Sequence, residues 1–129
     1  MPASYYIDAA RSILCVEHVG ETEPAQVYSV IDRMLADPRV RPGLQVVSDH
    51  SRETTISTIA GALDTLPRVI EFLDRMGSFR LAIVATRSVQ IGMVHFSAVY
   101  ARRRGIEMRA FRDRKEAEAW LLEERPEDE

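Results

Sequence analysis

The sequence lacks several features that would assign a protein to a class at once. It holds one cysteine in 129 residues, so it cannot form an internal disulfide, which is typical of proteins in a reducing compartment. It has no apolar run near the roughly 20 residues that cross a bilayer. Its first residues also lack the basic and apolar segments of a signal peptide. We therefore expect a cytoplasmic protein without a membrane span.

Motifs for cofactors and catalysis are missing as well. The sequence contains no GxGxxG, no GxxxxGK followed by Ser or Thr, and no GxSxG. The three histidines, His18, His50 and His95, fall in different expected elements, so we expect no metal site. No catalytic residue and no cofactor are predicted, and a non-enzymatic role is favoured over an enzymatic one.

An excess of positive charge is also absent. The net charge is −3, and the acidic segment 123–129 alone contributes −4, which leaves +1 on residues 1–122. A nearly neutral body argues against nucleic-acid binding, which needs a basic surface. We expect residues 1–122 to form one domain and residues 123–129 to form a solvated acidic tail.

What the sequence does contain is a regular alternation of strand and helix patterns. Strands are predicted at 4–7, 12–19, 43–49, 79–85 and 106–111, and helices at 22–38, 65–77, 88–105 and 113–125. This β-β-α-β-α-β-α-β-α order predicts an α/β fold with a mostly parallel sheet of about five strands. The first two strands should form an antiparallel hairpin, and the helices should pack on the sheet.

Helix caps and core positions can be assigned from the same patterns. Thr22 and Ser88 are expected to cap the first and third helices, and the second helix is expected to begin near Thr65. Whether residues 57–63 add a preceding helical turn stays open. We expect Cys15 to be an inert core thiol and Trp120 to be buried against the sheet.

Polar side chains gather where the predicted parallel strands end. Ligands of open α/β sheets bind beyond the carboxyl ends of the strands. The candidate ligand or partner rim consists of Asp49, His50, Thr86, Arg87, Ser88 and Arg112. Arg87 and the free N–H groups of the third helix would attract an anion, whereas Asp49 would repel it or pair with Arg87. The alternative is that these residues only cap the helix and the turns.

Four segments together resemble a known family. They are ADPRVRPGLQVVSDH (36–50), RLAIVA (80–85), GMVHFSAVYA (92–101) and MRAFRDRKEAEAWL (108–121). In these segments the chain resembles small bacterial STAS-like proteins related to anti-sigma-factor antagonists, and in outline the CRAL-TRIO lipid-transfer domains. The resemblance implies a STAS-like fold and a regulatory or protein-binding role with an unknown partner.

The resemblance also implies a candidate switch. In anti-sigma-factor antagonists the serine of an Asp-Ser pair at a helix start is phosphorylated to release a partner. TTISTIAG occupies that place here and makes Ser57 and Thr58 candidate phosphorylation sites, although the aspartate is missing. The partner could also be a second copy of the chain, joined through an open sheet edge.

The alternative function is binding of a small ligand, either an anion or a lipid headgroup. A cavity lined by Met93, Phe96 and Tyr100 beneath Arg87 would favour this alternative. A flat rim with an exposed hydroxyl near residues 57–58 would favour a protein partner.

Overall fold

The computed structural model describes residues 3–55 and 58–123. Their elements are β1 (Ala3–Asp8), β2 (Ile13–Gly20), α1 (Pro24–Ala36), β3 (Gln45–Glu53), α2 (Ile59–Met76), β4 (Arg80–Val84), α3 (Ser88–Arg102), β5 (Glu107–Phe111) and α4 (Arg114–Leu121). The predicted α/β class and element order are confirmed. Most of the predicted acidic tail lies outside the described residues.

The sheet runs in the order β1-β2-β3-β4-β5. β1 pairs with β2 in antiparallel fashion, and the remaining neighbours are parallel, as predicted. Cys15 of β2 lies opposite Val47 of β3, and Val47 lies opposite Ala82 of β4. The carboxyl ends of the four parallel strands therefore share one edge of the sheet.

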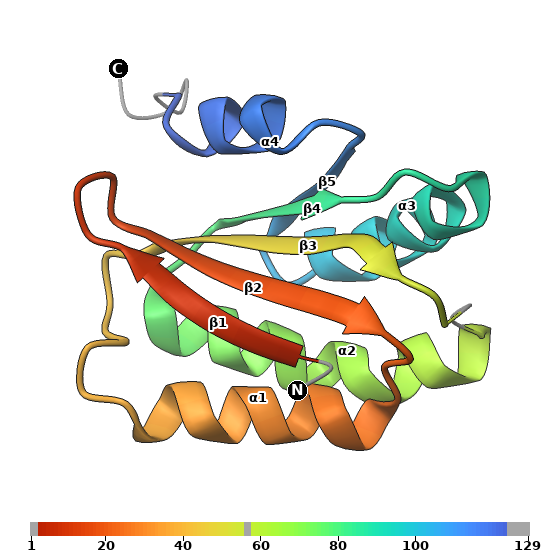
Figure 1. The fold of residues 1–129 in the computed structure, drawn as a ribbon, viewed down its shortest axis with the longest axis horizontal. Helices are drawn as coiled ribbons and strands as arrows, with labels where there is room; N and C mark the ends of the chain where they lie inside the picture. Colours follow the sequence, from red (N-terminus) through yellow and green to blue (C-terminus); the bar gives the residue numbers. More distant parts are fainter. Residues whose placement is uncertain (1–2, 56–57, 124–129) are drawn as a thin grey trace.

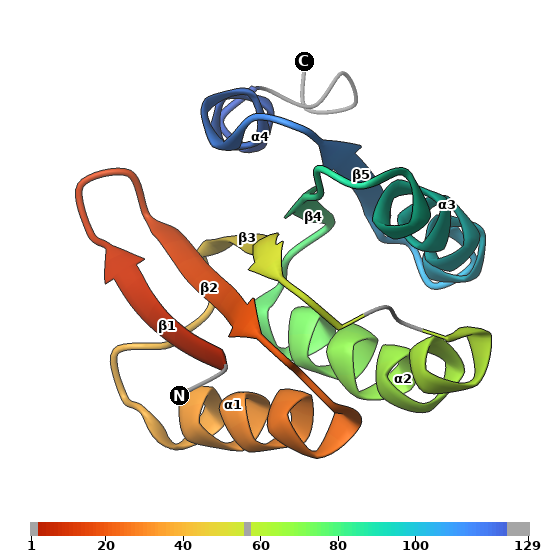
Figure 2. The same ribbon diagram turned by 45° about the vertical axis from the view of Figure 1, so that its right-hand side comes forward.

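The helices divide unequally between the two faces of the sheet. α1, α2 and α3 share one core with the sheet, and α4 packs alone on the other face (Figures 1 and 2). Successive side chains of a strand point to opposite faces. Val46 therefore joins the first core and Val47 the second. This alternation decides which polar residues farther along β3 can meet.

The core positions agree with the sequence prediction. Cys15 is 1% exposed and Trp120 is 5% exposed, and both belong to the core beneath α4. In the described part of the chain, no helix is both long enough and apolar enough to cross a membrane.

Helix α2 starts earlier than expected. It begins at Ile59 and not near Thr65, because Thr58 is a good N-cap whose hydroxyl oxygen accepts a hydrogen bond from the Gly61 N–H (3.0 Å). Pro67 therefore lies inside the helix. Burial of the apolar face at Leu66, Ile70 and Leu73 offsets the cost of Gly61 and Pro67.

The starts of α1 and α3 also differ from prediction by one residue. Glu23 is the N-cap of α1, and Arg87 is the N-cap of α3. The expected caps were Thr22 and Ser88. In both helices a glutamine in the first turn accepts from the backbone N–H of the cap residue through its side-chain oxygen, so a Ser or Thr cap is not needed.

Candidate functional site

A cavity of about 390 Å³ lies between the sheet and helices α2 and α3. This volume falls within the roughly 300–1,000 Å³ typical of small-molecule sites. Most of its wall is apolar and includes Leu66, Val69, Leu81, Ile83, Met93 and Val94. The residues Gly61, Ala62 and Ser97 also line it, and their small side chains leave the space open.

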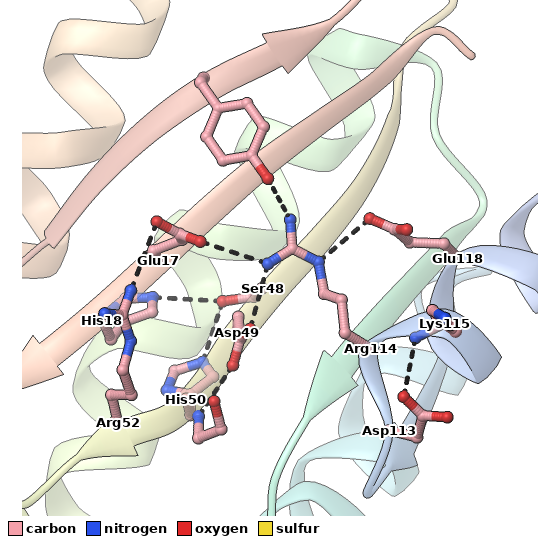
Figure 3. Close-up of polar contacts among 12 residues, drawn as sticks. Glu17, His18, Ser48, Asp49, His50, Arg52, Asp113, Arg114, Lys115 and Glu118 are labelled. Atoms are coloured by element: carbon pink, nitrogen blue, oxygen red, sulfur yellow. Dashed lines mark hydrogen bonds and ion pairs between the residues drawn. The ribbon is translucent and has the colours of Figure 1, made fainter.

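A polar cluster forms one wall of this cavity. His18 comes from β2, and Ser48, His50 and Glu53 come from β3. The Ser48 Oγ lies 3.2 Å from the His18 Nε2 and 2.9 Å from the His50 Nε2 (Figure 3). Alternation along β3 puts Ser48 and His50 on the same face, and the parallel register brings His18 beside them.

The two imidazole rings stack on each other and share a carboxylate at their far edge. Their centroids are 4.1 Å apart, and their planes differ by 10°. The Glu53 carboxylate lies 3.3 Å from the His50 Nδ1 and 3.9 Å from the His18 Nδ1. The Glu53 side chain is 8% exposed. The cluster therefore places a serine at one end of the stacked pair and a buried carboxylate at the other.

Burial controls the charge of His18. Desolvation, assisted by the neighbouring His50, holds the pKa of His18 well below its usual value of 6.5. Its ring is thus neutral at pH 7. The His18 Nδ1 is buried and has no hydrogen-bond partner among the described residues. A buried nitrogen without a partner costs free energy, so this atom is a natural contact point for a bound group.

The lowered pKa of His18 predicts acid sensitivity. The unfolded chain binds a proton at His18 below pH 6.5, whereas the folded chain does not, so stability falls as the pH drops below 6.5. The limiting slope for one group is about 1.4 kcal/mol per pH unit. Urea unfolding at pH 7.5, 6 and 5 in EDTA would measure this effect. Between pH 7.5 and 5, the free energy of unfolding of His18→Gln should fall by up to about 2 kcal/mol less than that of wild type.

The control is His95→Gln, which removes an exposed histidine on α3. We expect this variant to follow the wild-type pH profile. An unchanged profile in His18→Gln would contradict the prediction.

Arg87 and Gln90 hold the segment that follows β3 over the cavity. The Arg87 Nη2 donates hydrogen bonds to the backbone carbonyls of Glu53 (2.9 Å) and Thr55 (3.3 Å). The Gln90 side-chain amide donates to the His50 carbonyl (3.0 Å), and its oxygen accepts from the Thr86 and Arg87 N–H groups. The start of α3 is thereby fixed to the end of β3, and both elements line the cavity.

The six residues of the predicted rim do not converge on one site. His50 lines the cavity, and Arg87 is engaged with backbone carbonyls. Asp49 points to the opposite face of the sheet and pairs with Arg114 (3.1 Å), so its expected pairing with Arg87 is wrong. The reason is that β3 continues past residue 49, so the successive residues Asp49 and His50 point to opposite faces of the sheet.

The other rim residues lie at the surface. Arg112 donates to the Thr86 carbonyl (2.7 Å), and Ser88 is an exposed first residue of α3. Thr58 is exposed and also lines the cavity, while Ser57 lies outside the described residues. Phosphorylation of either hydroxyl stays a prediction.

His18, Ser48 and Glu53 were missed from the sequence because β3 was expected to end at residue 49. His50 and Glu53 were then assigned to a loop, where the spacing of residues does not indicate which side chains lie on the same side. With the longer strand, Ser48 and His50 share a face, and an irregularity in the β2–β3 register after Asp49 returns Glu53 to that face. The structure nevertheless brings His18, His50 and Glu53 together, with ligand atoms within 4.8 Å of one another, so the expectation of no metal site stays a prediction that this geometry calls into question.

Comparison with known proteins identifies the architecture. No family model and no curated protein sequence matches the chain. A crystal structure of an uncharacterized DUF3478 family protein from Shewanella loihica PV-4, described as having a SpoIIAA-like fold, is similar to it. The two share 18% identity with a TM-score of 0.64, over 93% of this chain and 94% of that chain. This protein has a SpoIIAA-like fold. The STAS-like architecture that the sequence motifs implied is thereby confirmed.

Proposed function

We propose that this SpoIIAA-like protein binds a small amphipathic molecule in the cavity between its sheet and helices α2 and α3. The observation that carries the proposal is the cavity itself, which is mainly apolar and has its polar groups gathered on one wall. Such a division suits a ligand with an apolar body and one polar group. Met93 lines the cavity as expected, whereas Phe96 and Tyr100 are exposed at 41% and 39%.

The charge of the wall selects the polar group of the ligand. No lysine or arginine of the described residues lines the cavity, whereas the Glu53 carboxylate does. A carboxylate repels an anion in a poorly solvated site. The predicted anion ligand is therefore less suited to this cavity than a neutral or cationic group that donates a hydrogen bond. The His18 Nδ1 and the Thr22 Oγ1, which have no hydrogen-bond partner among the described residues, are available to such a donor.

A series of ligands with one chain and different polar groups tests this proposal. We expect 1-decanol and decylamine to bind more tightly than decanoate at pH 7, because Glu53 repels the carboxylate. Calorimetry or displacement of Nile red fluorescence would measure the order. Tightest binding of decanoate would contradict the assignment of the polar wall.

A pair of variants on α3 tests the location of the site. Ser97 lines the cavity, whereas Val99 is 60% exposed two residues later. Ser97→Phe fills the cavity, so it should weaken decanol binding at least tenfold. Val99→Phe adds the same aromatic ring outside the cavity and should leave binding unchanged. Equal binding by both variants would place the ligand elsewhere.

A regulatory role through a protein partner is the second candidate, and the position of Thr58 favours it. Thr58 is exposed at the N-terminus of α2 and also borders the cavity. A phosphate there would add about −1.5 to −2 charges at the opening. Ligand occupancy and phosphorylation would then act on the same surface. The identity of the partner and a homodimeric state stay predictions, as does the cytoplasmic location.

A further inference from the structure

The polar wall contains a set of atoms whose chemistry is that of a metal site. The ring nitrogens of His18 and His50 and the carboxylate of Glu53 lie within 4.8 Å of one another. Two imidazoles and one carboxylate are a ligand set that zinc takes in catalytic sites. We propose that His18, His50 and Glu53 bind one divalent transition-metal cation of the Zn²⁺ type.

The hydrogen-bonding capacity of Ser48 supports this proposal. Its single hydroxyl contacts the Nε2 atoms of both histidines, at 3.2 and 2.9 Å. If Ser48 accepts from both rings, both Nδ1 atoms carry lone pairs toward the Glu53 carboxylate, and one cation bound between them satisfies all three. If Ser48 donates to one ring, the His18 Nδ1 is still without a partner. Histidine ligands commonly use their second nitrogen in this way to fix the ring.

The charge of Glu53 is a second, independent argument. Its side chain is 8% exposed, and its ion-pair partners in the described chain are His18 and His50. Arg87 donates to the backbone carbonyl of Glu53 and not to its carboxylate. No lysine or arginine of the described residues pairs with the Glu53 carboxylate, so a bound cation would supply it with a positive partner.

The distances are near those that coordination requires. Metal–ligand bonds of about 2.0–2.2 Å in a tetrahedron separate neighbouring ligand atoms by roughly 3.3 Å. The His50 Nδ1 and the nearer Glu53 oxygen are 3.3 Å apart, and the His18 Nδ1 is 3.9 Å from the other oxygen. The stacked rings direct their lone pairs in parallel, so they must turn about χ2 to converge. That torsion is soft for histidine.

Three protein ligands leave a fourth position on the cavity side, where water or a polar ligand group can coordinate. The metal would use the same polar wall as the proposed ligand, so the expected preference for decanol and decylamine over decanoate applies to the metal-free chain in EDTA. Metal binding without decanol binding would leave the metal proposal standing, and the reverse would leave the ligand proposal standing.

Titration of the untagged, EDTA-treated full chain tests the proposal. We expect Zn²⁺ calorimetry to show that the wild-type chain binds one equivalent. The affinity for Zn²⁺ should fall at least about 100-fold in His18→Ala and in Glu53→Gln, which is more than the 10–100-fold loss expected for Ser48→Ala. His95→Ala is the matched control, because His95 is exposed on α3, and it should bind as wild type does. Unchanged binding in His18→Ala, or equal loss in His95→Ala, would overturn the proposal.

A measurement on the wild-type chain covers the case in which a variant fails to fold. Co²⁺ substituted for Zn²⁺ should give the visible absorption of a four- or five-coordinate site, and imidazole ¹⁵N shifts should change at the Nδ1 atoms of His18 and His50. A spectrum of hexa-aqua Co²⁺ with unchanged ¹⁵N shifts would overturn the proposal whatever the variants do.

Discussion

Trp120→Ala is expected to lower the free energy of unfolding by about 3–5 kcal/mol. Trp120 is 5% exposed and packs on Phe111, with ring centroids 5.6 Å apart. The guanidinium groups of Arg80 and Arg109 lie 5.1 and 4.8 Å from its ring centroid. Truncation therefore opens a cavity beneath α4 and also removes the aromatic face from two cations, one of which is itself buried.

Urea unfolding followed by far-UV circular dichroism would measure the loss, because Trp120 is the only tryptophan and its fluorescence disappears in the variant. Trp120→Phe keeps a ring on the sheet and should cost less than the alanine variant. Leu122→Ala changes a neighbour that is 50% exposed, and it should stay within about 0.5 kcal/mol of wild type. A loss below about 1 kcal/mol in Trp120→Ala would show that α4 contributes little to the fold.

The burial of Trp120 was predictable because local patterns decide it. Residues 117, 120 and 121 form an apolar stripe of helical period, and Asp113 supplies an N-cap that accepts from the Lys115 N–H. The order of strands and helices along the chain followed from the alternation of strand and helix patterns. These features depend on neighbours within a few residues, which a single sequence shows directly.

The candidate site was not predictable in the same way because it depends on where β3 ends. The segment from Ser48 to Glu53 is polar, so its strand character comes from pairing with β2 and not from its own residues. That pairing carries His18, from a strand 30 residues earlier, to the Ser48 hydroxyl. Contacts of this kind depend on the register between neighbouring strands. The hydrophobic pattern alone does not determine that register at the carboxyl end of β3.

The same alternation assembles a second polar centre on the opposite face, around Arg114. Its guanidinium contacts the carboxylates of Asp49 (3.1 Å), Glu17 (3.3 Å) and Glu118 (3.0 Å), and it donates to the Tyr6 hydroxyl (2.7 Å) (Figure 3). The sequence interpretation placed none of these contacts, since they join β1, β2, β3 and α4. One cation thus holds three acidic groups together at the start of α4.

Arg114→Ala is expected to lower the free energy of unfolding by about 2–4 kcal/mol, because three carboxylates lose their shared cation while two of them stay largely buried. The Asp49 and Glu118 side chains are 16% and 10% exposed. Arg114→Lys keeps the charge but not the planar fork, so its loss should be intermediate. Arg112→Ala, which removes an exposed arginine bonded to one carbonyl, should stay within about 0.5 kcal/mol of wild type.

The pH dependence of the Arg114→Ala effect separates charge from packing. Burial alone would raise the pKa of Asp49, but hydrogen bonds from Ser51 and Arg114 outweigh it and hold that pKa below its usual value of 3.8. The stability that this shift contributes is present above pH 3.8 and is lost as the pH falls through the lower folded pKa. Without Arg114 the shift in the pKa of Asp49 is largely removed. The free energies of unfolding of wild type and Arg114→Ala should therefore approach each other below about pH 4. A difference that stays constant from pH 7 to pH 3 would show that Arg114 stabilises the fold by packing and not by its charge.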